Sequence, residues 1–193
     1  MPTNARRCPF SVKFRASPKP VMNKKLQKRF DRLALDQQKL LQKLSILSDE
    51  QLNTSPPGKW PISYIAAHLI TSERLSLIYM KKKSQGMPAL RNSGMVEEFK
   101  MLFLKVSQRF PFRFKAPDYL VQHTPTSVPL SDLVERWTKE RENLRKFLED
   151  IKDENLYKLV YKHPVAGRLN VLQALDFMIE HFHHHLPQIN RLL

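Results

Sequence analysis

The sequence predicts an all-α fold, a four-helix bundle with a long crossover connection between its second and third helices. Three observations predict this class. The chain has 193 residues but only 4 glycines, and scarce glycine favours long helices over many tight turns. Apolar residues recur at alternating steps of three and four along four separate segments, as they do on one face of a helix. No segment shows a convincing strand pattern.

The first two helices follow from this spacing. The first is predicted to begin at Asn23 and to end near Ser48, with inward positions at Leu26, Phe30, Leu33, Gln37, Leu40, Leu44 and Leu47. The second begins near Pro61, because proline suits a first helical turn. It ends in Lys81–Lys83, cations that suit a helix C-terminus. Its inward positions are Ile65, His68, Ser72, Leu75 and Tyr79.

A long connection is predicted over residues 84–129. It contains a possible short helix over Val96–Arg109, followed by several prolines. A connection of this length permits a crossover, so the second and third helices need not be antiparallel neighbours.

The third and fourth helices occupy the rest of the chain. The third is predicted to begin at Ser131 as N-cap, with inward positions at Leu133, Trp137, Glu140, Leu144, Phe147 and Ile151. Residues 152–169 form a second connection. The fourth helix starts after Asn170 and runs close to the last residue, with inward positions at Val171, Ala174, Met178, His181, His185 and Gln188.

The N-terminal 22 residues differ in character from the rest. They contain four prolines and no acid, and the first 25 residues account for +7 of the net charge of +15. We interpret residues 1–22 as a disordered basic extension outside a single domain, 23–193. A translation start at Met22 would explain the extension, and its arginines also resemble a mitochondrial targeting segment, although its prolines oppose the required helix.

Composition narrows the function classes. A single cysteine, Cys8, excludes an internal disulfide framework and a multi-cysteine zinc site, and favours a cytoplasmic protein. No apolar run is long enough to cross a membrane. The basic charge supports an alternative function, a non-catalytic helical-bundle protein that binds nucleic acid or another anionic partner. A nucleic-acid partner is not expected, because basic and aromatic residues do not alternate as in single-strand binders.

Polar residues at inward helical positions indicate a candidate functional site. His181 and His185 are four residues apart, so their imidazoles share one helix face and can bind one ion. His68 is the other histidine at an inward helical position. Three histidine ligands would leave coordination positions open, as in catalytic zinc sites. The alternatives are a hydrogen-bonded core histidine at position 68 and a solvated pair on the last helix.

Other polar residues surround this candidate site. Gln188 is a candidate second-shell partner of a ligand imidazole. His184 either flanks the site in the second shell or contacts a partner. Glu140 could orient His68 or act as a general base. Alternatively, it pairs with a basic side chain of another helix at the rim of the bundle. The other histidines are expected to be structural or solvated: His123, His163 and His183.

Three separated segments carry a resemblance to a known family. They are Gly58-Lys59-Trp60-Pro61 with His68-Leu69, His163-Pro164-Val165-Ala166-Gly167-Arg168, and the run His181-Phe182-His183-His184-His185-Leu186-Pro187-Gln188-Ile189. Together they resemble the DinB-like (DNA-damage-inducible) metalloenzyme superfamily over residues 24–193, in the right order.

The resemblance implies a four-helix bundle, often a homodimer, with His68, His181 and His185 as ligands of one divalent metal ion. Zinc or nickel is the expected ion, and iron or copper also suits three histidines. Related bacillithiol and mycothiol S-transferases join a low-molecular-weight thiol to an electrophile. The implied activity is therefore that of a thiol S-transferase or a hydrolase acting on a small-molecule substrate. The hypothesis for a transferase is that the metal holds the thiol as its thiolate.

Overall fold

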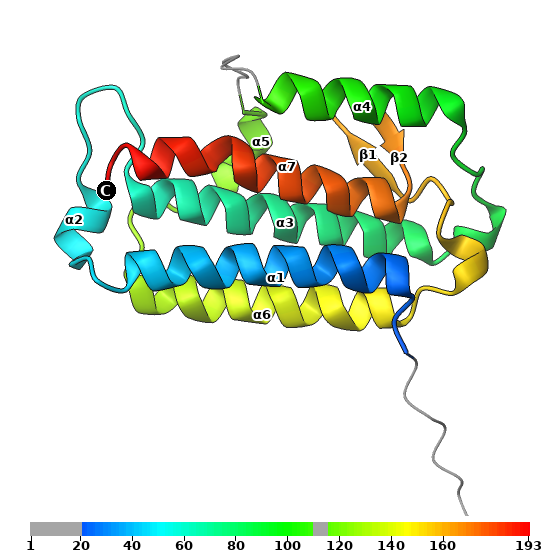
Figure 1. Cartoon of the computed structure of the whole chain (residues 1–193), viewed down its shortest axis with the longest axis horizontal. Coiled ribbons are helices and arrows are strands. Elements are labelled where there is room, and N and C mark those ends of the chain that lie inside the picture. The colour runs from blue at the N-terminus through cyan, green and yellow to red at the C-terminus, as the bar shows by residue number, and fades with distance from the viewer. Residues whose placement is uncertain (1–20, 110–115) are drawn as a thin grey trace, which may run out of the picture.

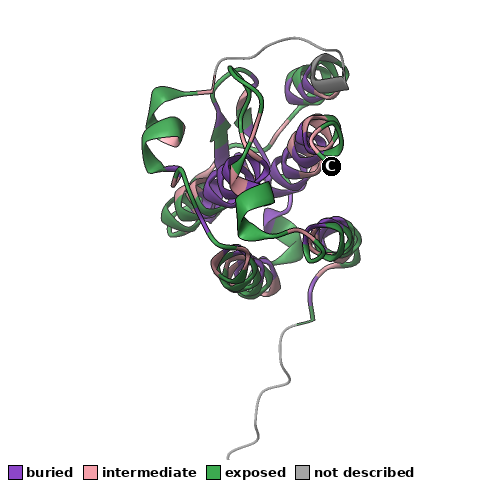
Figure 2. Cartoon of the chain, turned by 90° about the vertical axis from the view of Figure 1, so that its left-hand side faces the viewer, coloured by how far each residue is buried: buried purple, intermediate pink, exposed green. Residues whose placement is uncertain are grey.

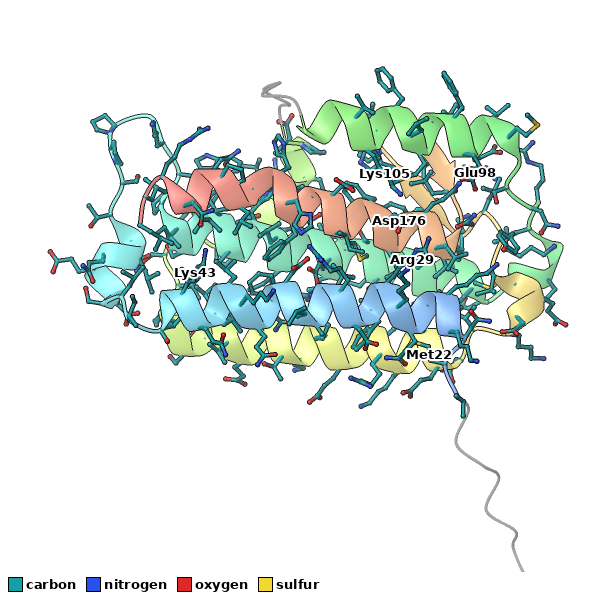
Figure 3. The ribbon with its side chains drawn as sticks, in the orientation of Figure 1. Met22, Arg29, Lys43, Glu98, Lys105 and Asp176 are labelled. Atoms are coloured by element: carbon teal, nitrogen blue, oxygen red, sulfur yellow. The ribbon has the colours of Figure 1, made fainter. Side chains whose placement is uncertain are left out.

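The computed structural model describes residues 21–109 and 116–193, with side chains as far as Val106 in the first range. Residues 1–20 of the predicted extension lie outside the described residues. Met22 is buried against the apolar core just ahead of the first helix (Figure 3). The packed region therefore includes Met22, which the sequence analysis assigns to the extension.

Four long helices lie side by side and account for most of the helical structure (Figure 1). They are α1 Lys24–Leu44, α3 Ile62–Ser84, α6 Leu130–Glu149 and α7 Val171–Asn190. Helix α1 packs against α7 and α6, and α3 also packs against α6 and α7. The described part of the chain is mostly helical, as predicted, with one small two-stranded sheet. None of the described helices combines the length and apolar character needed to cross a membrane.

Buried apolar residues form the core between these helices. Figure 2 shows the buried residues (purple) concentrated where the helices face one another. The predicted inward positions of α1 are buried from Leu26 to Leu44. Helix α3 is buried around most of its circumference, as expected for a helix in the middle of a structure. The sequence predicted a single inward face for α3, but residues on several of its faces are buried.

The described residues of the connection between α3 and α6 form two helices and a 3-10 turn. The chain passes through the 3-10 helix Met87–Ala89, α4 Met95–Arg109 and α5 Asp118–His123. The predicted short helix over Val96–Arg109 is thus present as α4, and it packs against α7. The colours of Figure 1 show that α3 and α6 run in the same direction, so the chain crosses the length of the molecule between them.

Two helix boundaries depend on capping contacts. Ser48, expected near the end of the first helix, instead caps a short helix, α2 Asp49–Asn53, in a capping box with Gln51. Helix α6 begins one residue before the predicted N-cap Ser131, after Pro129 and without a side-chain cap of its own. The backbone N–H of Leu130 donates to Asp49 Oδ1 of α2 over 3.0 Å. A cap supplied from 81 residues away has no local sequence signal.

The second connection contains the one feature that contradicts the expectation of no strands. After a 3-10 turn over Asp153–Asn155, strands β1 Tyr161–His163 and β2 Gly167–Leu169 pair antiparallel, with His163 opposite Gly167. Gly167 has a φ of 74°, which glycine adopts readily. Strands of three residues are too short to show a recognisable alternation of apolar and polar residues, so the hairpin was not predicted.

Candidate metal centre

The structure brings the three predicted histidines together. Their ring nitrogens lie within 4.8 Å of one another. His181 Nε2 lies 3.3 Å from His68 Nε2 and 3.1 Å from His185 Nε2. His68 comes from the N-terminal half of α3, and the other two come from successive turns of α7. Because α3 packs against α7, residues more than a hundred positions apart in sequence meet on one site.

Aromatic rings hold these imidazoles in place. The Trp60 ring lies 5.3 Å from the His68 ring and 6.3 Å from the His185 ring, nearly parallel to the latter. The Phe177 ring stacks on the His181 ring at 5.5 Å. Trp60 is in the segment before α3, and Phe177 is one turn before His181. Each imidazole therefore packs against an aromatic neighbour that limits its rotation.

Burial makes all three histidines weak bases. It lowers the pKa of His68 to about 4 and that of His185 to about 3, with smaller contributions from neighbouring histidines. Burial also lowers the pKa of His181 well below its ordinary value, and the surrounding imidazoles add to the effect. At neutral pH each ring is uncharged and carries one nitrogen with a free lone pair, the form that binds metals.

The hydrogen bonds of the rings fit a metal on the Nε2 side. His185 Nδ1 donates to Gln188 Oε1 over 3.2 Å, which leaves the lone pair on Nε2. His68 Nδ1 is buried and has no hydrogen-bond partner within the described residues. An unpaired buried polar atom costs about 1–3 kcal/mol and is most often retained where a function needs it. Three converging neutral imidazoles are a donor set that suits one divalent ion.

A large open cavity of about 1260 Å³ adjoins the three histidines. Its wall on α3 contains all five residues predicted as the inward seam of that helix, together with Ser76: Ile65, His68, Ser72, Leu75 and Tyr79. The polar and aromatic residues elsewhere in the wall include Trp60, Tyr119, Tyr161, Phe177, Glu180 and Gln188. The face of α3 that was predicted to point into the core thus lines a cavity, and other faces of the helix pack in the core.

Glu140 does not join this group. It lies on α6 with its carboxylate 4.0 Å from Arg74 Nε, and it is not among the residues that line the cavity. The neighbouring Arg141 is buried and pairs with Glu73 at 2.9 Å and with Gln37 at 2.9 Å. The inward polar positions therefore form two separate groups, one at the histidines and one around Arg141.

His184 and His183 lie on either side of the candidate ligands. The His184 ring is 5.2 Å from that of His185, and it lines the cavity. His183, expected to be solvated, is half-buried, and its Nε2 donates to Asp36 Oδ2 of α1 over 2.9 Å. This contact ties α7 to α1, because the pair lies where the two helices pack.

The sequence did not assign a site role to three further cavity residues. Tyr161 is buried, accepts a hydrogen bond from Ser76 Oγ over 3.0 Å, and has a pKa raised by burial. His163, expected to be structural, packs its ring against Phe177 at 4.4 Å and has a pKa lowered by burial to about 4. Glu180 is buried in the same wall. Tyr161 and His163 lie on strand β1 of the hairpin. Because the strands were not predicted, neither residue was expected to lie beside the three histidines.

Comparison with known proteins agrees with this arrangement. The family model of the DinB superfamily matches residues 32–189. The chain belongs to the DinB superfamily. A curated relative, the uncharacterized protein YuaE of Bacillus subtilis (strain 168), is 27% identical over 147 residues, which cover 76% of this chain and 85% of the relative. No solved structure matches the chain. The resemblance described from the sequence is therefore confirmed at the level of the family.

Proposed function

We propose that this DinB superfamily member binds one divalent metal ion through His68, His181 and His185, and acts on a small molecule in the adjoining cavity. One observation carries the proposal: the Nε2 atoms of three neutral imidazoles converge at the wall of a large cavity. Three nitrogen ligands leave open coordination positions, as in catalytic zinc sites. Zinc or nickel is the ion we expect, with iron or copper as alternatives.

The helical framework in this proposal is a four-helix bundle of α1, α3, α6 and α7, with the crossover between α3 and α6. Its role is to hold α3 and α7 at a fixed separation. Gln188 keeps His185 in the tautomer that exposes Nε2, and Trp60 and Phe177 restrict the imidazoles. These contacts support a preorganised site, in which little conformational entropy is lost when the ion binds.

The activity we propose is that of a thiol S-transferase or a hydrolase. A bound divalent ion would lower the pKa of a thiol or water molecule that it binds. Glu180 is a better candidate than Glu140 for accepting a proton, because it lies in the cavity wall and Glu140 does not. Tyr161 keeps its proton at neutral pH and can donate a hydrogen bond to substrate.

The cavity lining favours a small molecule with both apolar and anionic parts. Among the described residues, three permanent cations line it, Lys59, Lys162 and Arg191, against a single carboxylate, that of Glu180. Aliphatic and aromatic side chains cover much of the remaining wall, among them Ile65, Leu75 and Tyr119. An anionic group would be attracted to the cationic positions, and an apolar group would pack on the rest.

Metal content measured by mass spectrometry on tag-free protein tests the proposal. We expect one metal ion per chain in the wild type, and its loss in His68→Ala and His185→Ala, because each variant removes a ligand that no neighbour replaces. His123→Ala is the matched control, since His123 is exposed on α5 and lies outside the cavity wall. Circular dichroism checks that all three variants fold. A wild type without metal after soaking with zinc and nickel, or variants that retain it, would contradict the proposal.

The same metal-loaded protein distinguishes the two activities. Calorimetric titration with cysteine, a simple low-molecular-weight thiol, should release heat for the transferase and not for His185→Ala. Metal-loaded protein that binds no thiol would remove the transferase and leave metal-assisted hydrolysis as the proposal.

A further inference from the structure

Two residues of strand β1 line the cavity from the same side of the strand. Tyr161 and His163 are separated by one residue, so their side chains project from one face of β1. Both are buried, and both belong to the cavity wall. Their ring centres lie 6.5 Å apart. Strand β1 packs against α3, the helix that carries His68, so the hairpin presents two polar rings to the cavity that adjoins the three histidines.

The turn of the hairpin fixes the tautomer of His163. The backbone N–H groups of Val165 and Ala166 donate to His163 Nδ1 over 3.1 Å and 3.0 Å. A ring nitrogen that accepts hydrogen bonds carries a lone pair and no proton, so the one proton of the neutral ring is on Nε2. Burial, which lowers the pKa of His163 to about 4, keeps the ring neutral at pH 7. His163 is therefore held as a hydrogen-bond donor at Nε2.

Tyr161 supplies a second donor. Its hydroxyl oxygen accepts from Ser76 Oγ of α3, which leaves its own proton for another acceptor. Among the described residues, neither this proton nor His163 Nε2 has a hydrogen-bond acceptor. No carboxylate contributes to the pKa of either residue. Water in the cavity is the acceptor left to the two donors, and an ionised oxygen of a ligand is a stronger one.

Phe177 separates this pair from the candidate metal ligands. The Phe177 ring lies 4.4 Å from the His163 ring and 6.1 Å from the Tyr161 ring. It also stacks on the His181 ring at 5.5 Å. A group that the pair binds therefore lies about one aromatic ring away from the three histidines. At that separation the pair can recognise part of a molecule whose reacting part is at the metal centre.

The charge beside the pair favours an anionic ligand group. Lys162 lies between the two residues and also belongs to the cavity wall. Hydrogen bonds to an ionised acceptor are roughly twice as strong as those between neutral groups. A carboxylate has two acceptor oxygens, which match two donors on neighbouring rings. These features favour a carboxylate over a neutral carbonyl group.

We propose that Tyr161 and His163 form a specificity-determining subsite, in which the Tyr161 hydroxyl and His163 Nε2 donate to a carboxylate of the molecule in the cavity. The inference rests on the proposed function in one respect, that the bound molecule is the substrate of the metal centre. It narrows the substrate to a carboxylate on an apolar body, with the reacting group on the far side of Phe177 from the carboxylate.

Binding of para-fluorobenzoate, an apolar ring with one carboxylate, to the chelator-treated full chain tests the subsite. Fluorine NMR measures the dissociation constant. His163→Asn keeps a side-chain oxygen that can accept from the N–H groups of the turn, and it removes the Nε2 donor. Tyr161→Phe keeps the ring and removes the hydroxyl. Each variant should weaken binding about tenfold, the effect of losing one hydrogen bond to an ionised acceptor.

Tyr157→Phe is the matched control. It removes an exposed hydroxyl that lies outside the described cavity wall and accepts from Lys25, so the variant should bind the probe like the wild type. The neutral para-fluorobenzyl alcohol has the same ring and should bind at least tenfold more weakly than para-fluorobenzoate. Circular dichroism checks that the variants fold.

Three results would overturn the proposal. They are a wild type that binds para-fluorobenzoate no better than the alcohol, folded His163→Asn and Tyr161→Phe with unchanged affinity, and binding that occurs only after metal is added. The last result would place the carboxylate on the ion. A protein that binds the probe but never binds metal would keep the subsite and remove the proposed function.

A second measurement decides the question if the variants fail to fold. In wild-type protein with isotope-labelled histidine, NMR of the ring nitrogens should show His163 with a proton on Nε2 and none on Nδ1. Addition of para-fluorobenzoate should shift the signal of the His163 Nε2–H group. A proton on Nδ1, or an Nε2–H signal that the probe does not move, would overturn the proposal.

Discussion

At the scale of single residues, the candidate site depends on burial that keeps imidazoles uncharged. His68 and His185 are 2% and 6% exposed, and no carboxylate is among the interactions that shift their pKa values. A buried imidazolium without a counter-ion is costly, so the folded protein strongly favours the neutral rings. This condition serves metal binding, which requires a free lone pair on each ligand.

The stability of chelator-treated protein should therefore depend on pH. In the unfolded chain a histidine takes up a proton as pH falls through about 6.5, whereas in the folded chain His68 does so only near 4 and His185 near 3. Unfolding binds protons in this window, so stability is complete above about pH 6.5 and is lost as pH falls toward 4. Each histidine contributes a slope of about 1.4 kcal/mol per pH unit.

Urea unfolding at pH 7 and pH 5 measures this effect. The free energy of unfolding should be clearly lower at pH 5, and His68→Phe should reduce the difference by the contribution of one histidine. Equal stability of the wild type at the two pH values would show that these imidazoles do not titrate as their burial requires.

At the scale of elements, α7 organises the site. One of its faces carries His181 and His185. The opposite face carries His183 against Asp36 of α1 and, two turns earlier, Asp176, which both Arg29 and Lys105 approach (Figure 3). Helix α7 is thereby connected to α1 and α4 by ion pairs and to α3 by packing. A shift of α7 along its axis would disturb all these contacts together, so the histidine pair is held in register with His68.

The beginning of α7 is fixed by a capping box that we expect to be important for stability. Asn170 accepts from the N–H of Gln173, Gln173 Oε1 accepts from the N–H of Asn170, and Asn170 Nδ2 donates to Ser93 Oγ. Asn170→Ala removes the side-chain partners of buried groups and should destabilise the fold by about 1–2 kcal/mol. Chemical denaturation measures the change.

Asn190→Ala provides the matched control at the other end of the same helix. Asn190 is exposed and caps nothing, so its replacement should change stability by less than about 0.5 kcal/mol. Similar losses in the two variants would mean that the capping box has no special role.

At the scale of the whole molecule, the path of the chain decides which helices are neighbours. The crossover through α4 and α5 lets α3 and α6 run in the same direction, and the chain then returns through the hairpin to α7. As a result α3 lies between α6 and α7. His68 and the pair on α7 meet because of this topology, although more than a hundred residues separate them.

A metal ion bound across α3 and α7 should stabilise the whole fold. A ligand that binds only the folded state at a hundred times its dissociation constant adds about 2.7 kcal/mol. For a domain of this size, that corresponds to a rise in Tm of roughly 5–10 °C. Scanning calorimetry of chelator-treated protein with and without added zinc or nickel measures the shift. His185→Ala should show none, and a wild-type Tm that no ion changes would argue against a site that joins the two helices.

Much of the helical structure could be predicted because its signals are local. The cap at Asn170, the spacing of buried leucines in α1 and the four-residue step from His181 to His185 are each set within one or two turns. The predictions failed where distant groups act. Asp49 helps to set the start of α6. Gln37 pairs with Arg141 and does not join the histidine site. The hairpin strands are stabilised by pairing with each other and by packing on α3.

The sequence by itself determined the helical class, the long helices and the three histidines at inward positions, because side-chain period and spacing depend only on the chain. The tertiary structure alone decided that His68 faces a cavity, that Trp60, Phe177 and Tyr161 surround the site, and that Glu140 does not join it. It also decided that α4 buries one apolar face and exposes another. The physical reason is that these properties depend on which helices pack together, and packing sums many weak, non-local contacts that no local pattern records.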